Sequence, residues 1–332
     1  MGKAIRAGVR WASMCFSSTG PAMSEPRLDS VTCVSPAGFH RMAYWEWGDP
    51  DNARVLVCVH GLTRNGRDFD HLARRLSTRY RVVCPDVVGR GQSDWLGNPM
   101  HYTIAQYASD MMTLLARLQP ATLAWVGTSM GGLIGLGLAG ALGMARQAHA
   151  TQAHAGMPLP ATQELRFDRI VLNDVGPRLQ RAALDRICEN VGTPGIFNTF
   201  AEAVQATKLA CATFGPHSEA HWSELADHSY VREGQHWIKR YDLNIALALA
   251  AQASPQAYEA GEHLLWHAYE GLDCPILVLR GEQSDLLTEA TVQEMRRRNP
   301  RTQERVFAGV GHAPTLMTPE QIEPVARFLE AG

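Results

Sequence analysis

The chain has 332 residues, with 31 Lys and Arg against 33 Asp and Glu and a formal net charge of −2. This near-neutral balance gives no electrostatic footprint for nucleic acid or an anionic membrane surface. Hydrophobic residues make up 45% of the chain and charged residues 19%, which excludes wholesale disorder. The longest stretch without a polar side chain, Met130 to Ala145, has 16 residues, whereas a membrane-spanning helix needs roughly 20. We therefore expect a globular protein without a transmembrane segment.

The N-terminal residues and the cysteines indicate the cellular setting. Residues 1–24 are basic and contain no acidic residue. We expect residues 1–26 to form a flexible tail; a transit peptide, or sequence upstream of a true start at Met23, are the alternatives. The seven cysteines form no CxxC pair and are odd in number, which favours a reducing compartment over a disulfide scaffold and predicts no metal site. We expect a cytoplasmic protein.

Short β-branched runs alternate with longer helical segments along most of the chain. This alternation is typical of an α/β fold with a mostly parallel sheet covered by helices. The predicted strands are 39–47, 54–59, 81–85, 122–126, 169–173, 275–280 and 304–308. The predicted helices include 102–118, 130–144 and 319–330.

The alternation stops between about Gly176 and Gly261, where amphipathic pieces with scattered aromatic residues replace the strands. We interpret 177–262 as a helical, mobile lid inserted between two strands of a core formed by 27–176 and 263–332. A short polar duplication at 147–155 contains His149 and His154. These histidines could suggest a metal site, but we expect a solvated surface loop there.

A G-x-S-x-G motif, Gly127-Thr-Ser129-Met-Gly131, follows the strand 122–126 and precedes an apolar, helix-like run. This strand–turn–helix context is the one in which such a serine is a nucleophile. The turn strains the backbone at Ser129, and side chains at positions 127 and 131 would clash with neighbouring segments. Glycine at both positions removes the clash.

The dipeptide His60-Gly61 directly follows the strand 54–59, where a second backbone donor is needed to face the nucleophile. We expect the N–H groups of Leu62 and Met130 to form an oxyanion hole, with His60 and Gly61 supporting it. A plain turn is the alternative interpretation of the dipeptide.

A serine nucleophile of this kind needs an acid and a base in the chain order Ser, Asp, His. His312 lies in a glycine-rich loop after the last predicted strand, and we expect it to be the base. We predict Asp285, after the strand 275–280, as the acid. Asp174, directly after the strand 169–173, is the main alternative, although it could equally shape the hinge of the lid. Glu282 is a third candidate.

Four motifs together resemble the α/β-hydrolase superfamily. They are Val-Cys-Val-His60-Gly61-Leu, Asp86-Val-Val-Gly89-Arg90-Gly91-Gln-Ser93, Gly127-Thr-Ser129-Met-Gly131-Gly132 and Gly311-His312. The chain is most similar to the cap-bearing branch of bacterial carboxylesterases, enol-lactonases and meta-cleavage C–C hydrolases. The resemblance implies an eight-stranded, mostly parallel sheet with a lid inserted after the sixth strand. We expect Asp86 and Arg90 to hold their loop in place.

The predicted activity is hydrolysis of a small-molecule carboxylic ester through an acyl-enzyme on Ser129, with no cofactor and no metal. C–C bond hydrolysis or lactone opening on the same triad is the alternative, and a non-catalytic binding protein is a more distant one. The run Gly135-Leu-Gly137-Leu-Ala-Gly140 fits a dinucleotide fingerprint, but it lies inside a predicted helix and predicts close helix–sheet packing instead. We expect a monomer or homodimer without nucleic-acid or membrane partners.

Overall fold

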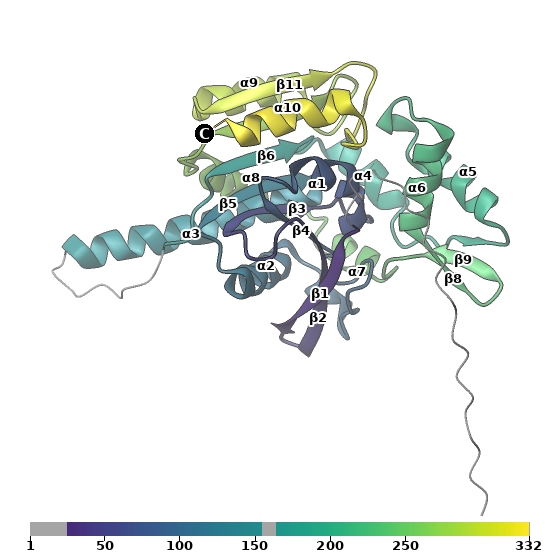
Figure 1. The fold of residues 1–332 in the computed structure, drawn as a ribbon. Helices are drawn as coiled ribbons and strands as arrows, with labels where there is room; N and C mark the ends of the chain where they lie inside the picture. Colours follow the sequence, from purple (N-terminus) through teal and green to yellow (C-terminus); the bar gives the residue numbers. More distant parts are fainter. Residues whose placement is uncertain (1–24, 155–163, 332) are drawn as a thin grey trace, which may run out of the picture.

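The computed structural model describes residues 25–154 and 164–331, so most of the N-terminal tail predicted for 1–26 lies outside the described residues. Within the described part of the chain, eight strands form one sheet in the order β1-β2-β4-β3-β5-β6-β10-β11 (Figure 1). The strands are β1 (Arg27–Ser35), β2 (Gly38–Trp47), β3 (Arg54–Val59), β4 (Arg81–Pro85), β5 (Thr122–Thr128), β6 (Arg169–Asn173), β10 (Ile276–Gly281) and β11 (Thr302–Phe307). The β1–β2 and β2–β4 pairs are antiparallel and the other pairs parallel, so the predicted α/β fold with a mostly parallel, eight-stranded sheet is confirmed.

Helices cover both faces of this sheet because its central strands are apolar on both sides. All of β3 after Arg54 is buried, as continuous apolar strands of parallel sheets usually are. One face packs against α1 (Asp70–Leu76) and α10 (Pro319–Glu330), which contribute Leu72 and Val325 to its core. The other face packs against α2 (Ile104–Leu118), α3 (Met130–His154), α8 (Pro255–Glu270) and α9 (Glu289–Arg298). The sheet is thereby held between two apolar layers, and its carboxyl-end loops are free to carry a site.

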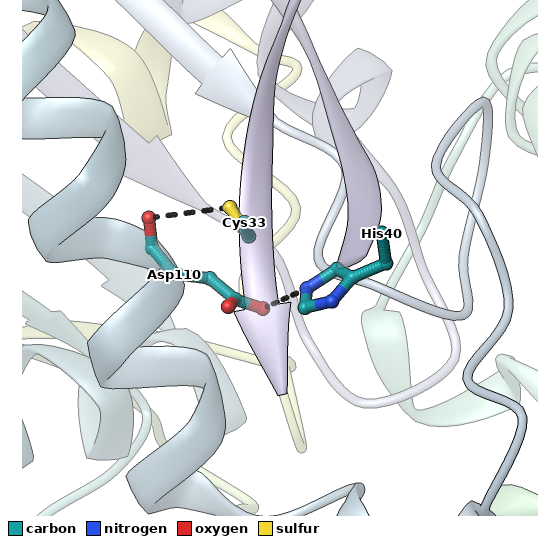
Figure 2. A group of neighbouring side chains, drawn as sticks. All are labelled: Cys33, His40 and Asp110. Atoms are coloured by element: carbon teal, nitrogen blue, oxygen red, sulfur yellow. Dashed lines mark hydrogen bonds and ion pairs between the residues drawn. The ribbon is translucent and has the colours of Figure 1, made fainter. Parts of the chain in front are cut away.

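The edge strand β1 was not among the predicted strands. Its sequence, RLDSVTCVS, mixes polar and apolar residues, and only every second residue of its second half is buried. The β1–β2 hairpin is fixed to α2 by a buried pair: the His40 imidazole lies 3.0 Å from a carboxylate oxygen of Asp110. Figure 2 shows this pair together with Cys33, whose sulfur contacts the Asp110 backbone carbonyl. A polar contact thus anchors a hairpin whose apolar pattern is weak.

A long segment joins β6 to β10, and its middle part lies to one side of the sheet, at the right of Figure 1. It contains α4 (Arg181–Glu189), α5 (Phe200–Ala210), α6 (Glu219–Ser229) and α7 (Ile245–Ala251). It also contains a small antiparallel sheet of β7 (Ile196–Phe197), β9 (His236–Lys239) and β8 (Tyr230–Glu233). The sequence predicted helices here but not these strands. We call residues 177–262 the inserted segment.

Helix α8 begins inside the inserted segment and continues to Glu270, so the predicted boundary between 262 and 263 falls within one helix. Its C-terminal half packs on α3: a Cβ atom built on Gly140 would lie 3.2 Å from the Cβ of Ala268. A Cβ on Gly135 would lie 2.5 Å from the Trp125 ring nitrogen of β5, so the predicted close packing on the sheet occurs at Gly135, whereas Gly140 packs on α8.

Helix α3 has 25 residues and continues to His154. The predicted surface loop at 147–155 is therefore wrong for 147–154, where alanine-rich sequence favours the helix; residue 155 lies outside the described residues. The end of α3 projects away from the sheet (Figure 1). Of the helices that the structure describes, none combines the length and the apolar character needed to cross a membrane.

Candidate active site

Ser129 lies at the tight turn between β5 and α3. Its φ angle is +51°, a conformation that costs a non-glycine residue energy and that turns the side chain outward from the end of the strand. The turn leaves no space around its glycines. A Cβ at Gly127 would lie 2.4 Å from the Gly131 carbonyl oxygen, and a Cβ at Gly131 would lie 1.9 Å from that of Val59. The glycines of the motif are thus a steric requirement of the turn.

His312 reaches this serine from the loop after β11. Its Nε2 lies 2.9 Å from the Ser129 hydroxyl, and its side chain is largely buried. The inserted segment supports this loop from outside. The Thr213 hydroxyl donates a hydrogen bond to the His312 carbonyl, and the Thr213 carbonyl accepts one from the Gly311 N–H. The structure therefore brings together the serine and the histidine that the sequence singled out.

The carboxylate at the other side of His312 belongs to Asp174. Its Oδ2 lies 2.7 Å from His312 Nδ1. Asp285, which the sequence favoured, instead forms an exposed ion pair with Arg186 at 2.9 Å. The placement of Asp285 beside His312 is therefore wrong, because the loop after β10 directs it outward while Asp174 turns inward directly after β6. Glu282 is likewise not the partner: its carboxylate accepts the Gly309 N–H at 3.0 Å.

The surroundings of Asp174 fix its orientation. The residue has a φ of +55° and no solvent exposure. Its Oδ1 accepts the Gly281 N–H at 2.9 Å, and its Oδ2 accepts the Ser284 hydroxyl at 2.6 Å as well as the imidazole. A carboxylate oxygen accepts the hydrogen of His312 Nδ1, and the tautomer with hydrogen on Nδ1 leaves Nε2 able to take the Ser129 proton.

The two residues predicted to form an oxyanion hole, Leu62 and Met130, both lie beside Ser129. Met130 is the first residue of α3, where N–H groups have no partner within the helix. Leu62 follows the His60-Gly61 turn, and a Cβ at Gly61 would lie 3.8 Å from that of Ser129, so this turn lies directly against Ser129. Both Leu62 and Met130 line the space around Ser129.

His60 is a structural residue beneath this turn. It is fully buried, its Nδ1 lies 2.7 Å from the Gly61 carbonyl, and its Nε2 accepts the Val87 N–H at 2.9 Å. These partners require the neutral tautomer with hydrogen on Nδ1. Burial lowers the pKa of His60 to about 3, so the ring stays neutral at physiological pH.

Arg90 connects the two halves of the predicted oxyanion hole. The buried guanidinium donates to the Leu62 carbonyl at 2.9 Å and lies 3.5 Å from the Met130 sulfur. Asp86, in the same loop, accepts the N–H groups of Gly66 and Gln92. These contacts hold the loop in the manner expected from the sequence.

Two cavities meet at Ser129. The first, of about 250 Å³, contains His312 and is bounded by the inserted segment through residues such as Ile187, Phe214 and Tyr230. We call it the His312 cavity. The second, of about 350 Å³, contains Met130 and is lined mainly by apolar side chains such as Leu133 and Leu249. We call it the Met130 cavity. A linear substrate with its reacting bond at Ser129 can therefore extend in two directions.

One cluster of possible metal ligands lies away from these cavities, where ligand atoms of Cys33, His40 and Asp110 lie within 4.8 Å of one another. The carboxylate of Asp110 already accepts from His40 and, at 2.8 Å, from Gln106. Burial raises the pKa of the Cys33 thiol to about 12, which keeps it protonated, whereas a metal ligand is a thiolate. The cluster fits a structural hydrogen-bond network.

A second cluster, formed by Asp70, Glu224 and His228, lies where α1 meets α6. The carboxylate of Asp70 is paired with Arg67 at 2.9 Å, and that of Glu224 lies 3.0 Å from the His71 imidazole. The Arg67–Asp70 pair lies within the core, and the His71–Glu224 contact joins the inserted segment to it. None of the three residues lines either cavity at Ser129.

Comparison with known proteins identifies the family. The model of the alpha/beta hydrolase family matches residues 56–328. The chain belongs to the alpha/beta hydrolase family. This hydrolase is 46% identical over 309 residues to the 3-hydroxybutyrate-oligomer hydrolase of Cupriavidus necator, and the match covers 92% of this chain and 98% of that protein.

Solved structures agree with this assignment. An alpha/beta hydrolase from Novosphingobium aromaticivorans is similar, with a TM-score of 0.75 and 31% identity. The match covers 94% of this chain and 100% of that one. A protein from Rickettsia typhi has a TM-score of 0.77 and 28% identity, covering 92% of this chain and 99% of that one. The family, the fold and the expectation of an enzyme rather than a binding module are confirmed.

Proposed function

We propose that this hydrolase cleaves the ester bonds of short 3-hydroxybutyrate oligomers through an acyl-enzyme on Ser129. The observation that carries the chemistry is the continuous hydrogen-bond chain from Ser129 through His312 to Asp174. The substrate class rests on the similarity to the Cupriavidus necator protein, which extends over nearly the whole of both chains.

In this proposal the Ser129 hydroxyl attacks the ester carbonyl while His312 Nε2 accepts its proton. The N–H groups of Leu62 and Met130 stabilise the oxyanion of the tetrahedral intermediate. His312 then donates the proton to the departing alcohol oxygen, and the acyl group remains on Ser129. A water molecule that gives its proton to His312 cleaves the acyl-enzyme, and the proton returns to Ser129. Asp174 stabilises the imidazolium that forms in each half of the cycle.

The two cavities support an ester that continues on both sides of the reacting bond. Every internal ester of a 3-hydroxybutyrate oligomer has a hydroxyacyl unit on the acyl side and another on the alcohol side. One cavity can hold each unit, because both cavities reach Ser129. The apolar lining of the Met130 cavity suits the methyl and methylene groups of such a unit.

We further propose that the inserted segment is a cap that excludes water from Ser129. Its residues line both cavities: Ile187 of α4 contributes to each. Exclusion of water strengthens the interactions that stabilise charge in the transition state.

The six cysteines in the described part of the chain are free thiols, which supports a reducing, cytoplasmic setting for the enzyme.

A substrate panel tests the proposal. Purified enzyme should release 3-hydroxybutyrate from its linear dimer and trimer and should hydrolyse p-nitrophenyl butyrate, and Ser129→Ala should do neither. A dienoate C–C substrate, run beside these, should remain intact. Cleavage of the dienoate with no release of 3-hydroxybutyrate from the oligomers would assign the enzyme to the C–C hydrolases instead.

A further inference from the structure

Three cationic side chains line the His312 cavity, and two of them are already neutralised. The Arg64 guanidinium binds the carboxylate of Asp68 through two hydrogen bonds, at 2.8 and 2.5 Å. The Arg186 guanidinium binds Asp285 through two hydrogen bonds of 2.9 Å. These two arginines therefore carry little uncompensated charge into the cavity.

The third cation, Lys239, is different. It is the last residue of β9 and is half-buried, and its ammonium donates to neutral oxygens: the Thr193 carbonyl at 2.7 Å and the Tyr241 hydroxyl at 3.3 Å. Among residues 25–154 and 164–331, no carboxylate lies within ion-pair distance of the Lys239 ammonium. Burial lowers the pKa of Lys239, as expected for a cation taken out of water without an anion beside it. An ammonium has three donors, so one remains for a ligand in the cavity.

The position of His312 defines what occupies this cavity. In the proposed mechanism His312 protonates the departing oxygen, so the leaving unit lies next to the imidazole. His312 lines the same cavity as Lys239, whereas the other cavity contains Met130 and not His312; Leu62 lines both. The leaving unit therefore extends toward Lys239, and the acyl unit toward the Met130 cavity.

We propose that Lys239 binds the free carboxylate of the leaving unit, so that the enzyme cleaves the ester next to the carboxyl end of the oligomer. This inference rests on the proposed function. The terminal unit of such an oligomer is O–CH(CH₃)–CH₂–COO⁻, which carries its anion three bonds from the ester oxygen. The ester C–O bond breaks, His312 supplies the proton to that oxygen, and one 3-hydroxybutyrate leaves in each turnover. The shortened oligomer is released by water from Ser129 with a new terminal carboxylate.

The experiment uses a trimer whose carboxyl-terminal unit is 3-hydroxyvalerate and whose other units are 3-hydroxybutyrate, both as the free acid and as the methyl ester. The wild-type enzyme should release 3-hydroxyvalerate first from the free acid and should prefer the acid to the methyl ester in kcat/KM. Lys239→Met should reduce this preference by about tenfold to a hundredfold, the usual effect of removing a hydrogen bond to a charged group, mainly through a higher KM for the acid. Lys239→Arg should retain most of it.

The matched control is Lys208→Met. Lys208 also lies in the inserted segment, but it is paired with Glu219 at 2.7 Å and does not line the cavity, so this variant should keep the wild-type preference. A wild-type enzyme that cleaves the acid and the methyl ester equally well, or a Lys239→Met variant that folds and retains the preference, would overturn the inference while leaving the proposed function intact. Hydrolysis of p-nitrophenyl butyrate without cleavage of any oligomer would overturn both.

Discussion

Asp174→Asn is the most informative single substitution because the contacts of this side chain dictate how the amide must lie. Oδ1 accepts the Gly281 backbone N–H, which cannot reverse its polarity, so the amide oxygen must take that position. The amide NH₂ then takes the place of Oδ2, facing the Ser284 hydroxyl, which can rotate to accept, and His312 Nδ1. A donor at this point forces Nδ1 to be the acceptor and moves the ring hydrogen to Nε2.

A protonated Nε2 cannot accept the Ser129 proton, although all heavy atoms remain in place. We therefore expect kcat to fall by up to about 10⁴-fold, as is found when the acid of a serine triad is replaced by its amide. Asp285→Asn is the matched control. It removes an ion pair whose two side chains are each nearly half-exposed, and such pairs contribute between 0 and about 1 kcal/mol. Its rate should stay within about fivefold of wild type.

The assay is initial-rate hydrolysis of p-nitrophenyl butyrate, with circular dichroism and thermal unfolding to verify that each variant is folded. Active-site labelling with a fluorophosphonate gives a second measure of serine reactivity and should fall in parallel with kcat. If folded Asp174→Asn kept more than about a tenth of the wild-type rate, or if Asp285→Asn were the severely impaired variant, the assignment of the acid would be incorrect.

Three further outcomes follow from the same structure. Ser129→Ala should lose nearly all turnover and all fluorophosphonate labelling while keeping its thermal midpoint, since it removes only a hydroxyl; labelled Ser129→Ala protein would mean that another nucleophile reacts. Gly131→Ala places a Cβ 1.9 Å from the Val59 carbonyl oxygen and should not accumulate as folded protein. Its control is Gly143→Ala, whose Cβ would meet nothing closer than 4.0 Å and which should behave as wild type. Equal thermal midpoints of the two variants would contradict the close approach at Gly131. The pKa of His60 lies at about 3 in the folded chain against a usual value of 6.5, so below pH 6.5 the unfolded chain binds a proton that the folded chain does not. The free energy of unfolding should therefore decrease as pH falls, by about 2–3 kcal/mol for this residue at pH 4.5, and urea titrations of wild type and His60→Gln that showed the same pH dependence would contradict this.

The parts of the site that the sequence could predict are those built from contiguous residues. Ser129, Met130 and Leu62 each lie within three residues of the end of a strand, in a short glycine-containing motif, so their positions depend only on local turns. His312 could be predicted because it follows the last strand of the sheet. Local sequence and chain order are sufficient for these residues.

The acid depends instead on how two loops meet. Both Asp174 and Asp285 follow strands that are neighbours in the sheet, β6 and β10, so both candidates satisfy the same order in the chain. The structure shows that Gly281 and Ser284, from the loop predicted to supply the acid, donate hydrogen bonds to Asp174. The two loops thus contribute to one carboxylate site, and which of them provides the carboxylate is a tertiary property.

The misjudged secondary structure has a related cause. Strand β1 pairs only with β2 and lies at the edge of the sheet, so its sequence lacks the continuous apolar run of a central strand. The helical residues 147–154 are polar and alanine-rich at the end of a long helix, a composition shared with surface loops. In both places the sequence pattern is weak because few of the side chains are buried.

The hydrogen bonds between the core and α6 have a consequence for the timing of the reaction. Arg64 donates to the Ser229 hydroxyl, and the Asn65 amide donates to the His228 carbonyl at 2.6 Å. Both residues follow Leu62 by only two or three positions, so displacement of α6 would pull on the turn that contains Leu62. If substrate enters by displacement of α6, its admission would loosen the predicted oxyanion hole, and reassembly would require α6 to return. The enzyme would then be unable to activate a carbonyl while its interior is open to bulk water.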